Sequence, residues 1–219
     1  MELVETEQGL SLVEGELALR CDLGALADRL RPGRLERELL VRAARVRGVA
    51  SPRALDATAG LGEDALLLAA AGFEVELWER DATIAALLRD GLARAARAPG
   101  LADAVDRMTL HEGDSVAALA ALAPGEVDVV YLDPMFPART KSAAVKKKMQ
   151  LLQRLERPCT DEDGEALLRA AVAAAPRKVV VKRPPKGPEL AGVRPAYTLA
   201  GKAVRYDVVV PAQLPASEH

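Results

Sequence analysis

Residues 129–137 read Val-Val-Tyr-Leu-Asp-Pro-Met-Phe-Pro. Four apolar residues in a row predict a strand that is covered on both faces, as in a parallel α/β sheet. Ligands bind beyond the carboxyl ends of such strands, and Asp133 follows this end directly. The Asp133 carboxylate and the Pro134 carbonyl can both accept a hydrogen bond from an amino group, and the Phe136 ring offers a face for stacking. The stretch therefore predicts a site for a flat ligand with an exocyclic amino group, with a plain strand and Asp-Pro turn as the alternative.

Strand and helix patterns alternate on both sides of this stretch, which predicts a parallel, doubly wound sheet with right-handed crossovers. The expected strands are 54–58, 73–78, 108–111, 127–132, 178–181 and 205–210, and the expected helices are 63–71, 82–97, 114–122, 141–156 and 161–174.

The first 50 residues follow a different pattern. Residues 1–20 predict short antiparallel strands with turns at Gly9 and Gly15, and residues 23–47 predict two helices around Pro32-Gly33. We therefore expect a small N-terminal extension of strands and helices over residues 1–50 and the α/β domain over residues 51–219.

Length and composition limit the class of protein. A chain of 219 residues can hold one α/β domain with a small appendage. No apolar run reaches the roughly 18 residues of a membrane span, and the acidic start does not resemble a signal peptide. Cys21 and Cys159 are solitary and predict neither a metal site nor a disulfide. These features favour a cytoplasmic protein without a metal or a membrane partner.

Positive charge is concentrated in two segments, although the net charge of the chain is −2. Residues 139–155 and residues 177–186 are rich in lysine and arginine and contain no acid. A localised basic face on an acidic protein is typical of a phosphate-binding surface, while a solvated face of an amphipathic helix is the alternative for the first segment. The residues expected to contact RNA are Arg139, Lys141, Lys146, Lys147, Lys182 and Arg183.

A glycine-rich turn follows the first strand of the α/β domain. Residues 56–65 read Asp-Ala-Thr-Ala-Gly-Leu-Gly-Glu-Asp-Ala and contain G-x-G-x-x-A. Gly60 and Gly62 allow close approach of a ligand to the backbone, and the next helix presents free N–H groups. Glu79 ends the second strand, where a carboxylate can accept both hydroxyls of a ribose. Asp114-Ser115 follows the third strand, in a position suited to an adenine edge.

Two cofactors fit this pattern, a dinucleotide and S-adenosylmethionine. Asp56, Glu63 and Asp64 surround the turn with negative charge, which repels a pyrophosphate and attracts a sulfonium and an ammonium group. Electrostatics therefore favours S-adenosylmethionine. A plain tight turn with surface acids remains the alternative.

These motifs together resemble the ribosomal RNA small subunit methyltransferase J family. The resemblance covers roughly residues 51–210 in the same order, and it rests on the stretches 56–62, 79–80, 131–137, 141–143, 145–147 and 179–184. It implies a class I methyltransferase fold with a Rossmann-like, mostly parallel seven-stranded sheet. It also implies S-adenosylmethionine as methyl donor, S-adenosylhomocysteine as product, and methylation of a guanine N2 in 16S rRNA, with free rRNA or the 30S subunit as partner.

The resemblance assigns roles to individual residues. It implies cofactor contacts from Glu63-Asp64, Glu79-Arg80, Asp114-Ser115 and Asp133, and catalytic roles for Asp133, Pro134 and Phe136. Two departures stand out: Glu63 occupies a position where the family has a basic residue, and residues 23–38 differ from the family's Gly-rich, His-Arg-Arg-containing segment. Selection of the RNA target is therefore less firmly implied than the reaction type.

Three other functions remain open from the sequence. An NAD-dependent oxidoreductase could use the same glycine turn, but neither a Tyr-x-x-x-Lys motif nor a suitably placed histidine is evident. A non-catalytic RNA-binding module acting in ribosome assembly could share the fold. A methyltransferase acting on another RNA or DNA amino group could share the Asp-Pro-x-Phe motif.

Overall fold

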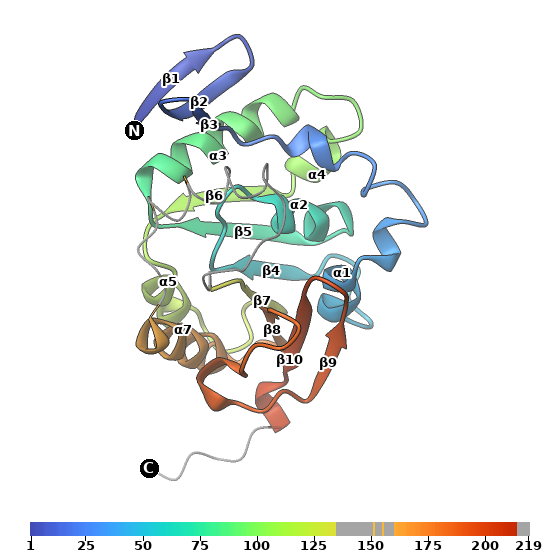
Figure 1. Cartoon of the computed structure of the whole chain (residues 1–219). Coiled ribbons are helices and arrows are strands. Elements are labelled where there is room, and N and C mark those ends of the chain that lie inside the picture. The colour runs from blue at the N-terminus through green and yellow to red at the C-terminus, as the bar shows by residue number, and fades with distance from the viewer. Residues whose placement is uncertain (135–150, 152–154, 156–159, 214–219) are drawn as a thin grey trace.

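A seven-stranded sheet forms the centre of the protein (Figure 1). The structure is a computed structural model that describes residues 1–134, 151, 155 and 160–213. Five strands are parallel, and β10 runs antiparallel to both of its neighbours. The strands, in their order across the sheet, are β6 (Met108–Glu112), β5 (Glu74–Glu79), β4 (Arg53–Asp56), β7 (Val129–Leu132), β8 (Lys178–Arg183), β10 (Arg205–Val209) and β9 (Tyr197–Ala200).

This arrangement confirms the predicted sheet. All four residues of β7 are buried, as expected for a central strand covered on both faces. Strand β9 is not predicted from the sequence, because Tyr197–Ala200 lacks the apolar run of the central strands. In the structure, three of its residues are exposed and one is partly buried. The mostly parallel seven-stranded sheet implied by the family resemblance is therefore present.

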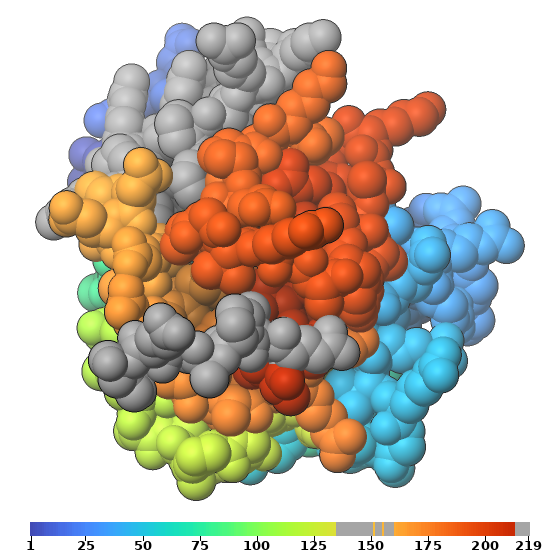
Figure 2. All heavy atoms as spheres, turned by 90° about the horizontal axis from the view of Figure 1, so that it is seen from below, coloured from blue at the N-terminus to red at the C-terminus, as the bar shows by residue number. Residues whose placement is uncertain are grey.

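Helices cover both faces of the sheet and enclose two apolar clusters. Figure 2 shows α7 in orange above α5 in yellow-green, on one side of the molecule. The helices on the first face are α1 (Leu39–Ala44), α2 (Glu63–Ala70) and α3 (Ala82–Ala95), with α4 (Ala102–Val105) beside α2 and α3, and those on the second face are α5 (Ser115–Ala121) and α7 (Asp161–Ala173).

The strand order reverses beside β4. From β4 the chain builds outward through β5 to β6, and it then returns to place β7 on the other side of β4. A crevice forms at such a switch point, beyond the carboxyl ends of the strands. Asp56 at the end of β4 and Asp133 just after β7 therefore lie next to one another in the fold.

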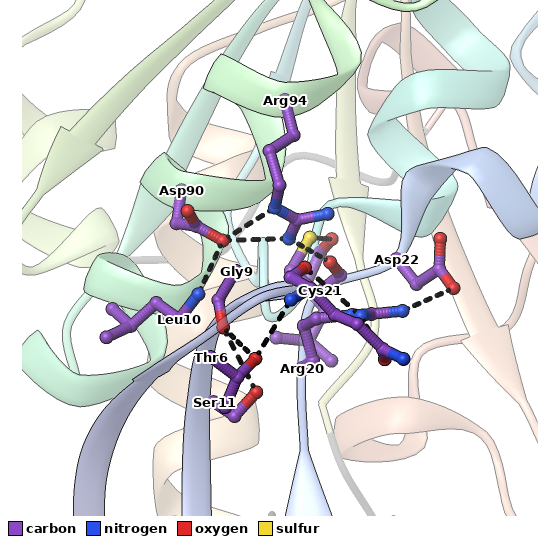
Figure 3. A network of polar contacts seen from close by, with 11 residues as sticks. Thr6, Gly9, Leu10, Ser11, Arg20, Cys21, Asp22, Asp90 and Arg94 are labelled. Atoms are coloured by element: carbon purple, nitrogen blue, oxygen red, sulfur yellow. Dashed lines mark hydrogen bonds and ion pairs between the residues drawn. The ribbon is translucent and has the colours of Figure 1, made fainter.

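A three-stranded antiparallel sheet, β1 (Glu2–Thr6), β2 (Gly9–Glu14) and β3 (Leu17–Leu19), precedes the main domain as predicted. It is attached to α3 by polar contacts (Figure 3). The Asp90 carboxylate accepts hydrogen bonds from the Leu10 N–H at 3.1 Å and from Arg94 at 2.8 Å. Arg94 also donates to the carbonyl of Cys21 at 2.6 Å. The boundary at residue 50 stays a prediction.

The two helices expected in residues 23–47 are only partly present. The chain forms two short 3-10 helices, η1 (Leu23–Leu26) and η2 (Leu35–Arg37), followed by the six-residue α1. Pro32 and Gly33, which has a φ of +80°, interrupt the helical path. Further 3-10 turns occur at η3 (Leu190–Gly192) and η4 (Pro211–Gln213).

The helix expected over 161–174 is confirmed as α7, which begins with a capping box between Thr160 and Asp163. The expected helix 141–156 lies almost wholly outside the described residues. Within the described part of the chain, no helix is both long and apolar enough to cross a membrane.

Candidate active site

Asp133 lies at the carboxyl end of β7, directly beside the end of β4. Its backbone N–H donates to the Thr58 hydroxyl oxygen at 2.7 Å. The Thr58 hydroxyl in turn donates to the Asp56 carboxyl oxygen at 3.4 Å, and the Thr58 N–H donates to the same oxygen at 3.0 Å. Thr58 therefore couples the turns that follow the two strands and holds the backbone of Asp133 in place.

The Asp133 side chain is paired with a lysine. Lys182, near the end of β8, places its Nζ 2.8 Å from an Asp133 carboxylate oxygen and 2.7 Å from an Asp64 carboxylate oxygen. The same Asp64 oxygen accepts a hydrogen bond from the Tyr131 hydroxyl at 2.6 Å. Two carboxylates therefore share one ammonium group, which leaves the cluster with a net negative charge.

Burial and pairing act in opposite directions on these groups. Burial raises the pKa of Asp133, while the neighbouring Lys182 lowers it. The two carboxylates raise the pKa of Lys182 and outweigh the desolvation that opposes them. Lys182 is therefore charged at neutral pH and favours the ionised form of Asp133. The Asp133 side chain keeps 31% of its surface exposed, so it remains available to a ligand.

The glycine turn is fixed by Glu79 at the end of β5. One Glu79 carboxylate oxygen accepts the Gly60 N–H at 2.9 Å, and the other accepts the Asp81 N–H at 2.8 Å. Gly60 has a φ of +53°, and a Cβ built there would meet only the Thr58 carbonyl, at 4.0 Å. The turn therefore has open space in front of it, where a ligand can approach the backbone.

Gly62 has a different structural role. Its φ is +73°, and a Cβ built there would lie 2.7 Å from the Leu88 side chain on α3. Gly62 is thus required for close packing of the turn against a neighbouring helix, in addition to any contact with a ligand.

The remaining expected cofactor residues lie at the same edge of the sheet. Asp114 is exposed and caps α5 by accepting the Val116 N–H at 2.9 Å, and Ser115 is the first residue of that helix. Arg80 is exposed after β5, and Glu63 is partly buried at the start of α2.

Asp56 requires a correction to the expected acidic crevice. Its residue surface is only 1% exposed, and burial raises the pKa of its carboxyl to about 8. At neutral pH the group is largely protonated, so it does not supply the negative charge expected of it. The local charge comes from Asp64 and Asp133, partly offset by Lys182, and Asp56 organises the turn through Thr58.

The expected RNA-binding residues separate into three groups. Arg183 is only 2% exposed and donates to the Pro188 carbonyl at 2.9 Å, so its expected contact with a phosphate does not fit the structure. Lys182 lies in the acidic cluster with Asp133 instead of on an outer basic face. Four expected contacts lie outside the described residues: Arg139, Lys141, Lys146 and Lys147.

The site predicted for an exocyclic amino group, formed by Asp133, Pro134 and Phe136, is described only in part. Pro134 is buried directly after Asp133, and Phe136 lies outside the described residues. Sequence reasoning missed Thr58 and Tyr131 as members of this cluster. Tyr131 could have been found from the sequence, because it lies two residues before Asp133 and residues two apart on a strand share a face. Thr58 could not, because it is 75 positions away from Asp133.

The residues present fit S-adenosylmethionine. An open glycine turn and the net negative charge beside β7 suit an adenosyl ligand with a sulfonium. Glu79 lies at this turn, but it is only 7% exposed and both of its oxygens accept backbone N–H groups, so in this structure it holds the turn. Among the described residues, no group of three or more His, Cys, Asp or Glu side chains could hold a metal ion.

Comparisons with known proteins agree with this fold. A family model described as "Putative SAM-dependent methyltransferase" matches residues 1–211. The ribosomal RNA small subunit methyltransferase J of Pseudomonas aeruginosa (strain LESB58) is 46% identical over 208 residues, covering 92% of this chain and 79% of that protein. Its namesake from Nitrosococcus oceani is 46% identical over 186 residues, covering 84% and 72%.

A crystal structure of a SAM-dependent methyltransferase from Neisseria gonorrhoeae matches with a TM-score of 0.76 and 34% identity, covering 99% of this chain and 85% of that one. The fold and these matches define a class I, S-adenosylmethionine-dependent methyltransferase. The chain belongs to the ribosomal RNA small subunit methyltransferase J family.

Proposed function

We propose that this protein transfers a methyl group from S-adenosylmethionine to the exocyclic N2 amine of a guanosine in small-subunit ribosomal RNA. The observation that carries the proposal is the Asp133 carboxylate, partly exposed at the end of β7 and paired with Lys182 at 2.8 Å. Curated relatives whose names specify small-subunit rRNA support this choice of substrate. The substrate, as free rRNA or as the 30S subunit, implies a cytoplasmic location.

Guanine N2 is a weak nucleophile because its lone pair is delocalised into the ring. When bound, S-adenosylmethionine supplies an electrophilic methyl group on a sulfonium. Asp133 and the Pro134 carbonyl accept N–H hydrogen bonds from the amine and aim its lone pair at that methyl. As the new N–C bond forms, the methyl–sulfur bond would break and leave the neutral thioether S-adenosylhomocysteine. The positive charge that develops on the nitrogen is stabilised by the neighbouring Asp133 carboxylate, which can then accept the proton released.

Lys182 and Thr58 position the carboxylate for this task. Lys182 favours the ionised form of Asp133, and Thr58 holds its backbone N–H at 2.7 Å. The Phe136 ring is proposed to stack on the base, a contact worth about 1–3 kcal/mol in other proteins. The basic residues between 139 and 148 are proposed to contact phosphates near the target nucleotide.

The proposal is tested with methyl-labelled S-adenosylmethionine and two acceptors, free small-subunit rRNA and 30S subunits that lack the modification. We expect label in one guanosine, identified as N2-methylguanosine by mass mapping. Asp133→Asn should lower kcat by at least about a hundredfold, because a neutral amide cannot take up the developing charge. Urea denaturation of this variant controls for folding, because Asp133 is itself an expected cofactor contact. Label at another atom, or near-normal turnover by the variant, would contradict the proposal.

A further inference from the structure

A hollow on the first face of the sheet lies outside the site described above. It measures about 380 Å³, within the range of small-ligand pockets. It is formed by residues of the N-terminal segment and of the C-terminal strands, which Figure 2 shows side by side in blue and in red. The hollow is lined by Arg29, Arg34, Arg37, Glu38, Leu39, Val204 and Tyr206.

The arginines of this hollow include one, Arg37, without an acid partner among the described residues, and a second, Arg34, whose partner lies outside the lining. Glu38 is the one acid in the lining, and both of its oxygens are bound by Arg29 at 2.8 Å. Arg34 pairs with Asp28 just outside the lining. Arg37 is exposed, with no hydrogen bond or ion pair of its side chain among the described residues. Residues 28–38 contain four arginines and three acids, so this segment carries a net positive charge.

The hollow adjoins the catalytic cluster through Tyr206. Tyr206 lies directly opposite Lys182 in the β10–β8 register, so their side chains share a face about 5 Å apart at Cβ. Burial and the charge of Asp64 raise the pKa of Tyr206. The charge of Asp133 also raises this pKa, and the charge of Arg29 lowers it. The hollow therefore lies on the acceptor half of the sheet, on the opposite side of β7 from the glycine turn.

We propose that this hollow binds the phosphate and sugar of a nucleotide next to the methylated guanosine, with Arg37 and Arg34 as the phosphate ligands. The proposal rests on RNA being the substrate. Guanidinium groups bind phosphate through paired, charge-assisted hydrogen bonds. Leu39, Val204 and the Tyr206 ring supply an apolar wall for the sugar. The register that pairs Tyr206 with Lys182 places the hollow on the same side of the sheet as the Asp133–Lys182 pair, as a subsite for an adjoining residue of the RNA chain requires.

The test compares Arg37→Ala and Arg34→Ala with Arg169→Ala, a matched control on α7, which covers the other face of the sheet. The probe is in vitro transcribed small-subunit rRNA, with binding measured over a range of salt concentrations. Each pocket variant should weaken binding about tenfold or more and flatten the log–log salt slope by about 0.7, while S-adenosylmethionine binding stays unchanged. Arg37→Lys should restore part of the slope.

Two failures are distinguishable. If the wild-type protein binds and methylates the rRNA while both pocket variants keep its affinity and salt slope, the subsite is wrong and the proposed function stands. If the wild-type protein neither binds nor methylates the rRNA, the proposed function is overturned and the subsite with it.

Discussion

At the scale of the residue, one ammonium group is shared by two carboxylates. Asp64 and Asp133 share the ammonium of Lys182, and the Tyr131 hydroxyl supplies a further donor to Asp64. A carboxylate held in this way is oriented on one oxygen by the lysine, while the rest of the group stays partly exposed. Lys182 therefore orients Asp133 and lowers its pKa, against burial, which is the larger effect and raises it.

Replacing Lys182 with Met should move the acid limb of activity to higher pH. Without the ammonium, Asp133 keeps the effects of burial and of the nearby Asp64, both of which raise its pKa. Loss of a paired cation typically shifts a carboxyl by about 1–3 pH units. The measurement is kcat/KM for rRNA methylation between pH 5 and 9, with the exposed Lys186→Met as control. An unchanged acid limb in Lys182→Met would rule out this role.

Asp56 should make the free energy of unfolding depend on pH. Burial raises the pKa of its carboxyl from 3.8 to about 8, so the folded protein binds this proton more tightly than the unfolded chain. The contribution to stability is full at low pH and is lost as pH rises through that window, by at most about 1.4 kcal/mol per pH unit.

Asp56→Asn keeps an oxygen acceptor for the Thr58 N–H and removes the titration. Its free energy of unfolding should fall less between pH 5 and 8 than that of the wild type, as measured by urea denaturation at four pH values. Parallel curves for the two proteins would show that Asp56 is ionised in the folded state over this range.

At the scale of the element, α3 connects the N-terminal strands to the sheet. Its start is capped by Asp81, whose carboxylate accepts the N–H groups of Thr83 and Ile84. Gly91 sits in the middle of this helix, although glycine is a poor helix former. A Cβ there would lie 2.2 Å from the Cys21 sulfur, so the glycine serves the contact between the two segments.

Gly91→Ala should therefore destabilise the protein, although the same change stabilises an ordinary helix by about 1 kcal/mol. The expected net loss is about 1–3 kcal/mol, because Cys21 and the helix must move apart. Urea denaturation gives the value. Adding Cys21→Ala removes the closest atom, so the double variant should lose less than the sum of the single changes. A stabilised Gly91→Ala protein would contradict this packing.

At the scale of the whole molecule, the N-terminal segment contributes to both the support and the acceptor side of the fold. The β1–β3 sheet rests on α3 through Asp90 and Arg94 (Figure 3), while residues 29–39 form one wall of the arginine-lined hollow. The N-terminal segment therefore packs on α3 and forms part of the hollow beside the C-terminal strands.

Asp90→Ala tests this attachment. It leaves the partly buried Leu10 N–H without its carboxylate acceptor and removes the ion pair of Arg94, at a cost of about 1–3 kcal/mol, while Arg94 keeps its hydrogen bond to the Cys21 carbonyl. Hydrogen exchange should rise in β2 while S-adenosylmethionine binding persists. Asp106→Ala, at an exposed position after α4, is the matched control. Unchanged exchange in β2 would show that the Asp90 contacts do not hold the sheet.

The sequence by itself determined the order of strands and helices and the position of Asp133, Gly60 and Glu79 at strand ends. These features follow from local periodicity and from chain order, which a parallel sheet converts into a common edge. The short 3-10 helices before α1 and the exposed strand β9 escaped prediction because neither has a long apolar repeat.

Only the tertiary structure decided which charges meet. Lys182 reaches Asp64 across 118 positions, Asp56 is buried instead of facing the crevice, and Arg183 turns inward to a carbonyl. The arginine-lined hollow likewise joins residues 29–39 to Val204 and Tyr206. Pairing and desolvation depend on the distances between side chains remote in sequence, and packing of the whole chain sets those distances.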